Sequence, residues 1–214
     1  MSSGPALEPD AIRARLASAS IGVRTNASLL GQGGRTRGDH DLNPNLGPPP
    51  LLRPAAVLVP IVLRTAAPTV LLTRRSPNLA DHAGQISFPG GRLEPEDPDA
   101  VAAALREATE EIGLARDRVD VVGRIDTYQT RTGYEITPVV GFVSAPFDLL
   151  IDPAEVVEAF EVPLAFLIDR ANHVREARSF KGATREFWAI PYQDYYIWGA
   201  TAGMLVNLSE ILGG

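Results

Sequence analysis

Residues 90–114 read GGRLEPEDPDAVAAALREATEEIGL, a glycine pair followed by a segment with helical periodicity. Glu107, Glu110 and Glu111 are spaced i, i+3 and i+4, so a helix places their three carboxylates on one face. Like charges at this spacing repel one another and destabilise a helix. A divalent cation bound by oxygen ligands offsets such repulsion, so the segment indicates a metal site beside a bare glycine backbone.

The same segment carries signals for both ends of this helix. Asp97 suits the N-cap position, Pro98 suits the first helical position, and Gly113 suits the C-terminal stop. An apolar stripe at helical spacing gives the helix a face to bury. The stripe consists of Val101, Ala104, Leu105, Ala108 and Ile112.

The composition narrows the classes of protein and partner. The chain has 214 residues, a hydrophobic content of 45% and a formal net charge of −6, which suit a folded domain with an extension. No stretch combines many Lys or Arg residues with aromatics, so a nucleic-acid polymer or an anionic membrane is not the expected partner. The absence of cysteine excludes disulfides, Cys-ligated zinc and iron–sulfur clusters.

No secretory leader is visible, and no apolar run approaches the ~20 residues of a membrane span. We therefore expect a cytoplasmic protein that acts on a small molecule, and a homodimer is compatible with the sequence.

The chain divides near residue 53. We expect residues 1–52 to form an N-terminal helix, at 7–19, and an arm at 22–50 that is rich in Gly and Pro. Residues 53–214 then form the main domain, with two hairpins, at 55–74 and 174–191. Strands around two substantial helices predict an α/β (α+β) layered domain. The expected strands are 55–64, 69–74, 119–124, 135–143, 174–179 and 186–191, with a short helix at 162–168 and a closing helix at 198–212.

Residues 106–114, REATEEIGL, closely match the pattern R-E-U-x-E-E-x-G-U, in which U is aliphatic. The chain therefore resembles the Nudix hydrolase family, which implies an α/β/α sandwich around a mixed β-sheet. One departure is visible between Gly91 and Arg106, where the chain is one residue longer than the family pattern. The early acidic position consequently falls on Asp97.

A second resemblance concerns residues 71–91, LLTRRSPNLADHAGQISFPGG. They are similar to the coenzyme A pyrophosphatase motif L-L-T-x-R-S-x3-R-x3-G-x3-F-P-G-G, except that Ala80 stands where the motif has Arg. The resemblance implies hydrolysis of coenzyme A (CoA), or a derivative, to adenosine 3′,5′-bisphosphate and 4′-phosphopantetheine. Arg74, Arg92 and His82 are the alternatives for the missing cation that a 3′-phosphate would bind.

The family resemblance also implies roles for particular residues. Mg²⁺ or Mn²⁺ is the expected cofactor, with Glu107 and Glu111 as the leading ligands and Glu110 as a third ligand or a water-orienting group. A main-chain oxygen near Gly90 or at Gly91 is expected to complete the set. The general base is not marked by the motif. Glu155 is our candidate, with a helix-start carboxylate as the alternative role.

The expected substrate-binding residues come from the loop before the helix. They are Arg74, Arg75, Phe88, Gly90 and Gly91. For Arg75 the alternative is to hold the loop, and for Phe88 it is to anchor the loop in the core.

Two other functions remain open at this point. Ala80 in place of Arg favours another dinucleotide substrate, such as ADP-ribose or NADH. A non-catalytic regulator that binds CoA or a nucleotide is the third reading, although a pure binder has no need of three glutamates.

Overall fold

The structure is a computed structural model that describes residues 7–21, 36–45, 51–180 and 183–213. Within these residues nine strands form one mixed sheet, and three more form a smaller antiparallel sheet. The strands of the main sheet are β1 (Arg37–Gly38), β2 (Arg53–Leu63), β3 (Thr69–Arg75), β4 (Ile86–Ser87), β5 (Gly90–Arg92), β6 (Val119–Arg124), β7 (Tyr128–Gln129), β8 (Tyr134–Ser144) and β9 (Val156–Pro163). The smaller sheet contains β10 (Val174–Phe180), β11 (Ala183–Tyr192) and β12 (Tyr195–Trp198).

The central strand β2 is covered on both faces. Its residues Ala55–Val62 are all buried, as expected of a strand between two layers. It pairs in parallel with β8 and antiparallel with β3 and β5, so the sheet is mixed. The helices are α1 (Pro9–Ile21), α2 (Ala100–Ile112), α3 (Leu164–Ile168) and α4 (Ala200–Leu212), with short 3₁₀ turns η1 (Arg116–Arg118) and η2 (Arg170–Asn172).

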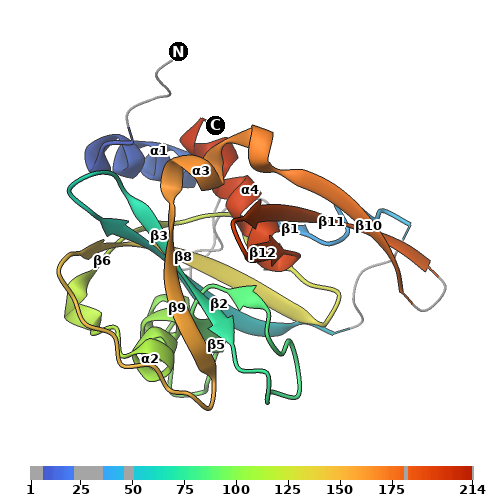
Figure 1. The fold of residues 1–214 in the computed structure, drawn as a ribbon, viewed down its shortest axis with the longest axis horizontal. Coiled ribbons are helices and arrows are strands. Elements are labelled where there is room, and N and C mark those ends of the chain that lie inside the picture. Colours follow the sequence, from blue (N-terminus) through green and yellow to red (C-terminus); the bar gives the residue numbers. More distant parts are fainter. Residues whose placement is uncertain (1–6, 22–35, 46–50, 181–182, 214) are drawn as a thin grey trace.

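Alternate residues of β2 face two separate hydrophobic clusters. Ala56 and Leu58 pack against α2, whereas Val57 and Val59 face the cluster that contains residues of α1, α3 and α4. Figure 1 shows α2 on one side of the main sheet and the other three helices on the opposite side. This arrangement confirms the expected α/β/α sandwich with a mixed sheet.

The N-cap of α2 differs from the prediction. Asp99, not Asp97, caps the helix, because its side chain accepts a hydrogen bond of 2.9 Å from the amide of Ala102. The carboxylate of Asp97 is instead occupied by Arg106 and by the amide of Glu94. The predicted stop at Gly113 is confirmed, since this residue has a left-handed φ of 66° and its amide bonds back to Thr109.

The predicted helix at 162–168 is only partly correct. Residues Val156–Pro163 form β9, which pairs antiparallel with β3, and the helix α3 begins at Leu164. β9 contains three valines and a phenylalanine, residue types that are enriched in strands. Glu155 therefore lies just before a strand, not at the start of a helix.

The N-terminal region contributes to the main core. Ile12 and Leu16 of α1 are buried, with exposures of 1% and 0%. β1 pairs in parallel with β7, so Arg37 and Gly38 form an edge of the main sheet. The remainder of the expected arm, residues 22–35 and 46–50, lies outside the described residues. None of the described helices is long and apolar enough to cross a membrane.

The hairpins at 55–74 and 174–191 are confirmed by antiparallel pairing of β2 with β3 and of β10 with β11. The sequence did not predict β12, which pairs with β11. Because Trp198 is the last residue of β12, the closing helix α4 starts at Ala200.

The tight contact at Gly113 gives a stability prediction. Gly113 and Gly84 have similar φ angles, 66° and 69°, but a Cβ on Gly113 would lie 2.8 Å from the main-chain nitrogen of Leu150, whereas one on Gly84 meets nothing within 4 Å. We expect Gly84→Ala to cost about 1 kcal/mol in unfolding free energy from backbone strain. Gly113→Ala adds the steric clash, about 2 kcal/mol more.

Urea unfolding of the two variants measures this difference. Equal losses would mean that the segment at Leu150 moves aside freely and that crowding at Gly113 does not fix the end of α2.

Candidate active site

Glu107 and Glu111 lie against the glycine pair that precedes α2. The amide of Gly90 donates a hydrogen bond of 3.2 Å to Oε2 of Glu111. A Cβ placed on Gly91 would lie 2.4 Å from Oε1 of Glu107, so a larger residue there would displace that carboxylate. At Gly90, which has a φ of 154°, a Cβ would lie 2.4 Å from the main-chain oxygen of Ala56, so this position requires glycine. The structure thus brings together two of the predicted metal ligands and both predicted glycines.

Glu110 lies in a different environment from the other two glutamates. Its side chain is 56% exposed and accepts a hydrogen bond of 2.8 Å from Nη1 of Arg106. The side chains of Glu107 and Glu111 are only 14% and 2% exposed. Spacing on the helix therefore places the three residues on one side, but only Glu107 and Glu111 face the glycines.

Arg106 holds the start of the site together. Its guanidinium donates to both oxygens of Asp97, to Glu107 and Glu110, and to the main-chain oxygen of Arg92. The hydrogen bonds from Arg106 lower the pKa of Asp97. Asp97 therefore pairs with this arginine despite the extra residue between Gly91 and Arg106, and the network fixes the loop against the helix.

Burial raises the pKa of both glutamates that face the glycine pair. Burial raises the pKa of Glu111 to about 8, and the charges of Glu107 and Glu155 add to this rise. Burial also raises the pKa of Glu107, with Arg106 opposing the shift. The charge of Glu155 adds to the rise of both pKa values, and its assignment as the general base stays a prediction.

These donors fit a hard divalent cation. Buried carboxylates with raised pKa values gain a counter-charge when a cation binds, and carboxylate oxygens are ligands that Mg²⁺ and Mn²⁺ prefer. Among the described residues, no three acidic or histidine side chains already converge in a geometry that would hold an ion. The assignments of Glu107, Glu110, Glu111 and Gly91 as ligands therefore stay predictions.

Arg74 and Arg75 point to opposite faces of β3, as consecutive strand residues do. Nη1 of Arg75 lies 3.6 Å from Oε1 of Glu111, and the buried Nε of Arg75 has no hydrogen-bond partner among the described residues. Arg74 instead pairs with Glu158 at 3.2 Å and lies over the ring of Tyr195. Arg75 is thus the arginine of this pair that lies beside the glutamates.

Phe88 is 2% exposed and belongs to the hydrophobic cluster on the face away from α2. This burial favours the alternative role of Phe88, which is to anchor the loop that carries Gly90 and Gly91 in the core.

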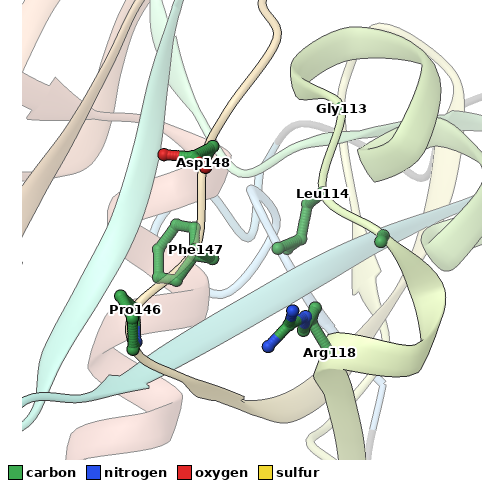
Figure 2. Close-up of a pocket in the computed structure, with 7 residues that line it drawn as sticks. Gly113, Leu114, Arg118, Pro146, Phe147 and Asp148 are labelled. Atoms are coloured by element: carbon green, nitrogen blue, oxygen red, sulfur yellow. The ribbon is translucent and has the colours of Figure 1, made fainter.

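A cavity of about 400 Å³ lies at the C-terminal end of α2. Figure 2 shows Leu114, Arg118 and Phe147 around it, and none of the three glutamates lines it. Its walls come from the turn after α2 and from residues 146–148, so it is separate from the site at Gly90 and Gly91.

Comparisons with known proteins agree with this geometry. The NUDIX domain model matches residues 52–182. The chain is 40% identical over 158 residues to NudL of Photorhabdus laumondii, an uncharacterized Nudix hydrolase, and the match covers 74% of this chain and 84% of that protein. It is also 40% identical over 161 residues to NudL of Escherichia coli strain K12, covering 75% and 83%.

Among solved structures, RenU, a Nudix hydrolase from M. smegmatis, aligns with a TM-score of 0.47 at 22% identity, over 64% of this chain and 78% of that one. The domain model spans more than half of the chain, and it includes the glycine pair, Arg106 and the glutamates of α2. The chain therefore belongs to the Nudix hydrolase family.

Proposed function

We propose that this Nudix hydrolase cleaves the diphosphate linkage of CoA or a CoA derivative, yielding adenosine 3′,5′-bisphosphate and 4′-phosphopantetheine. The observation that carries the reaction class is the placement of Glu107 and Glu111 against Gly90 and Gly91. The observation that supports CoA is the segment 71–91, whose residues resemble the CoA pyrophosphatase motif at every quoted position except Ala80.

In this proposal the glutamates bind the metal and an arginine binds the diphosphate. Glu107 and Glu111 would hold Mg²⁺ or Mn²⁺, with Glu110 and a main-chain oxygen at Gly91 as further ligands. When bound, such a cation supplies charge neutralisation at the diphosphate and lowers the pKa of a bound water. The Arg75 guanidinium, 3.6 Å from Glu111, is placed to contact a phosphate oxygen.

Glu155 remains our candidate for the general base. The contribution of its charge to the raised pKa values of Glu107 and Glu111 supports this choice, because a general base must act close to the metal ligands. The main chain at Ser76 bonds to the carbonyl of Glu155 at 2.7 Å, which fixes the backbone of this residue beside β3.

The alternative substrate class is another dinucleotide, such as ADP-ribose or NADH. Ala80 favours this alternative because it lacks the cation that the CoA motif carries at this position, and its side chain lies in an exposed turn.

A substrate panel tests the proposal. Purified protein with Mg²⁺ or Mn²⁺ is incubated with CoA, ADP-ribose and NADH, and products are identified by mass spectrometry. We expect CoA to give the two named products with the highest kcat/KM. Faster cleavage of ADP-ribose or NADH would assign the alternative, and binding without cleavage of any of the three would favour a non-catalytic regulator.

Glu111→Gln should lower turnover by at least ~10²-fold, because it removes a charged ligand and with it part of the charge stabilisation. Glu96→Gln is the matched control, since Glu96 is an exposed residue of the preceding loop. Steady-state rates at saturating metal measure the effect. Equal rates for the wild type and Glu111→Gln would remove Glu111 from the ligand set.

Metal affinity should depend on pH through the pKa of Glu111. Because burial raises this pKa to about 8, the carboxyl holds a proton at pH 6–7, and the cation must displace it. We expect the apparent affinity for Mn²⁺ to rise about tenfold per pH unit below pH 8 and to level off above it. Calorimetric titration from pH 6 to pH 9 measures this dependence. An affinity that is flat across that range would show that Glu111 is already ionised or does not bind the ion.

A further inference from the structure

Two arginines and a tyrosine meet at one end of the main sheet, next to the glycine pair. Arg53 is the first residue of β2, Tyr134 is the first residue of β8, and Arg92 is the last residue of β5. Arg53 and Tyr134 are direct partners in the β2–β8 pairing, and Arg92 pairs with Ala55. The three side chains are thereby placed on one face of the sheet.

Tyr134 positions both guanidinium groups. The carbon Cζ of Arg53 lies 4.5 Å from the centre of the Tyr134 ring. Arg92 donates from Nε and Nη2 to the Tyr134 hydroxyl, at 3.1 and 2.8 Å. This ordering removes much of the rotamer freedom that a long side chain would otherwise lose on binding a ligand.

Neither arginine has a carboxylate partner among the residues that the structure describes. Nη1 of Arg92 and all the donors of Arg53 consequently remain available to an anion. Two guanidinium groups without a described carboxylate partner therefore lie against the same tyrosine. They suit a phosphate monoester, which accepts several N–H bonds from such forks.

The other cations considered for an additional phosphate are already engaged. Arg74 pairs with Glu158 at 3.2 Å, and the Nδ1 atom of His82 lies 3.0 Å from Oε1 of Gln85. Arg92 differs from both, because its only described side-chain partner is a neutral hydroxyl.

The group formed by Arg53, Arg92 and Tyr134 is also close to the candidate metal ligands. Gly91 contacts Glu107, and the following residue is Arg92, whose carbonyl accepts a hydrogen bond from Arg106. Consecutive Cα atoms are about 3.8 Å apart, and consecutive side chains leave a strand on opposite faces. Since Arg53, Tyr134 and Arg92 lie where their strands end, a ligand at this end of the sheet can contact residues from both faces.

We propose that Arg53 and Arg92, positioned by Tyr134, bind a phosphate monoester on the same substrate whose diphosphate lies at Glu107 and Glu111. This inference rests on the proposed function and deepens it, since it assigns specificity for a substrate with one phosphate more than a plain nucleoside diphosphate derivative. CoA carries such a group as its 3′-phosphate, and a ribose 2′-phosphate has the same chemistry.

Kinetics with substrate pairs test the proposal. CoA is compared with dephospho-CoA, and ADP-ribose 2′-phosphate with ADP-ribose, for the wild type, Arg53→Gln and Arg92→Gln. Arg116→Gln is the matched control, because Arg116 is exposed in η1 and belongs to none of the strands β2, β5 and β8 that carry the three residues. We expect each variant at Arg53 or Arg92 to raise KM for the phosphorylated member about tenfold, with kcat little changed. KM for the member without the phosphate should stay unchanged, as should both constants of Arg116→Gln.

Tyr134→Phe provides a second measure. It keeps the ring under Arg53 but removes the hydroxyl that holds Arg92, so KM for the phosphorylated member should rise less than in Arg92→Gln. A KM that rises equally for both members of a pair would overturn the proposal and assign the arginines a structural role. A wild type without preference within either pair would overturn it as well.

A failure of this inference is distinguishable from a failure of the proposed function. Cleavage of dephospho-CoA or ADP-ribose with no phosphate preference leaves the hydrolase intact and removes the phosphate site. If no compound is cleaved, calorimetry with adenosine 3′,5′-bisphosphate and with adenosine 5′-monophosphate still decides. Tighter binding of the bisphosphate that is lost in Arg92→Gln supports the site, and equal binding of the two compounds overturns it.

Discussion

The carboxylate of Glu111 is enclosed by protein, and the rest of the site is arranged around it. It has one main-chain amide and one guanidinium nearby in place of water, and this is too little polar contact to keep its pKa in the ordinary range. This enclosure requires the glycine pair, because β5 must approach α2 closely enough for the amide of Gly90 to reach the carboxylate of Glu111. In our proposal, a cation that binds this carboxylate displaces a proton, because the pKa of Glu111 is raised.

The arginines near the site differ in how many hydrogen bonds and ion pairs they already make with the protein. Arg106 is fully used by carboxylates and one carbonyl, and it makes the loop and the helix a single rigid unit. Arg75 has only a long contact with Glu111 and a buried donor without a described partner. Arg53 and Arg92 are held by an aromatic residue, and no acid opposes them within the part of the chain that the structure describes. The firmly paired arginine supports the site, whereas the loosely paired ones retain donors for a ligand.

Much of this organisation could be predicted from the sequence. The family motif fixed the fold class, the helix and its glutamates, because each needs particular residue types at fixed spacing. The N-cap was wrong because two aspartates flank Pro98, and the choice between them depends on Arg106, which reaches Asp97 from a later turn of the helix. The distinction between Glu110 and Glu111 could not be predicted, since helical spacing does not determine burial. β9 was missed because a strand is defined by its partner, here β3, which lies far away in the sequence. For the same reason, no motif marked Arg53 as a neighbour of Tyr134.

The burial of α1 shows that the folded domain extends beyond the segment matched by the family. The segment shared with the family begins at residue 52 and ends at residue 182, yet Ile12 and Leu16 before it and most of α4 after it fill the layer on the far side of the sheet from the glutamates. A fragment trimmed to the shared segment would leave that layer open to solvent and strip support from Phe88, whose ring anchors the glycine loop. The residues of the candidate site thus lie within the segment matched by the family, whereas α1 and α4, which pack behind the sheet, lie outside it.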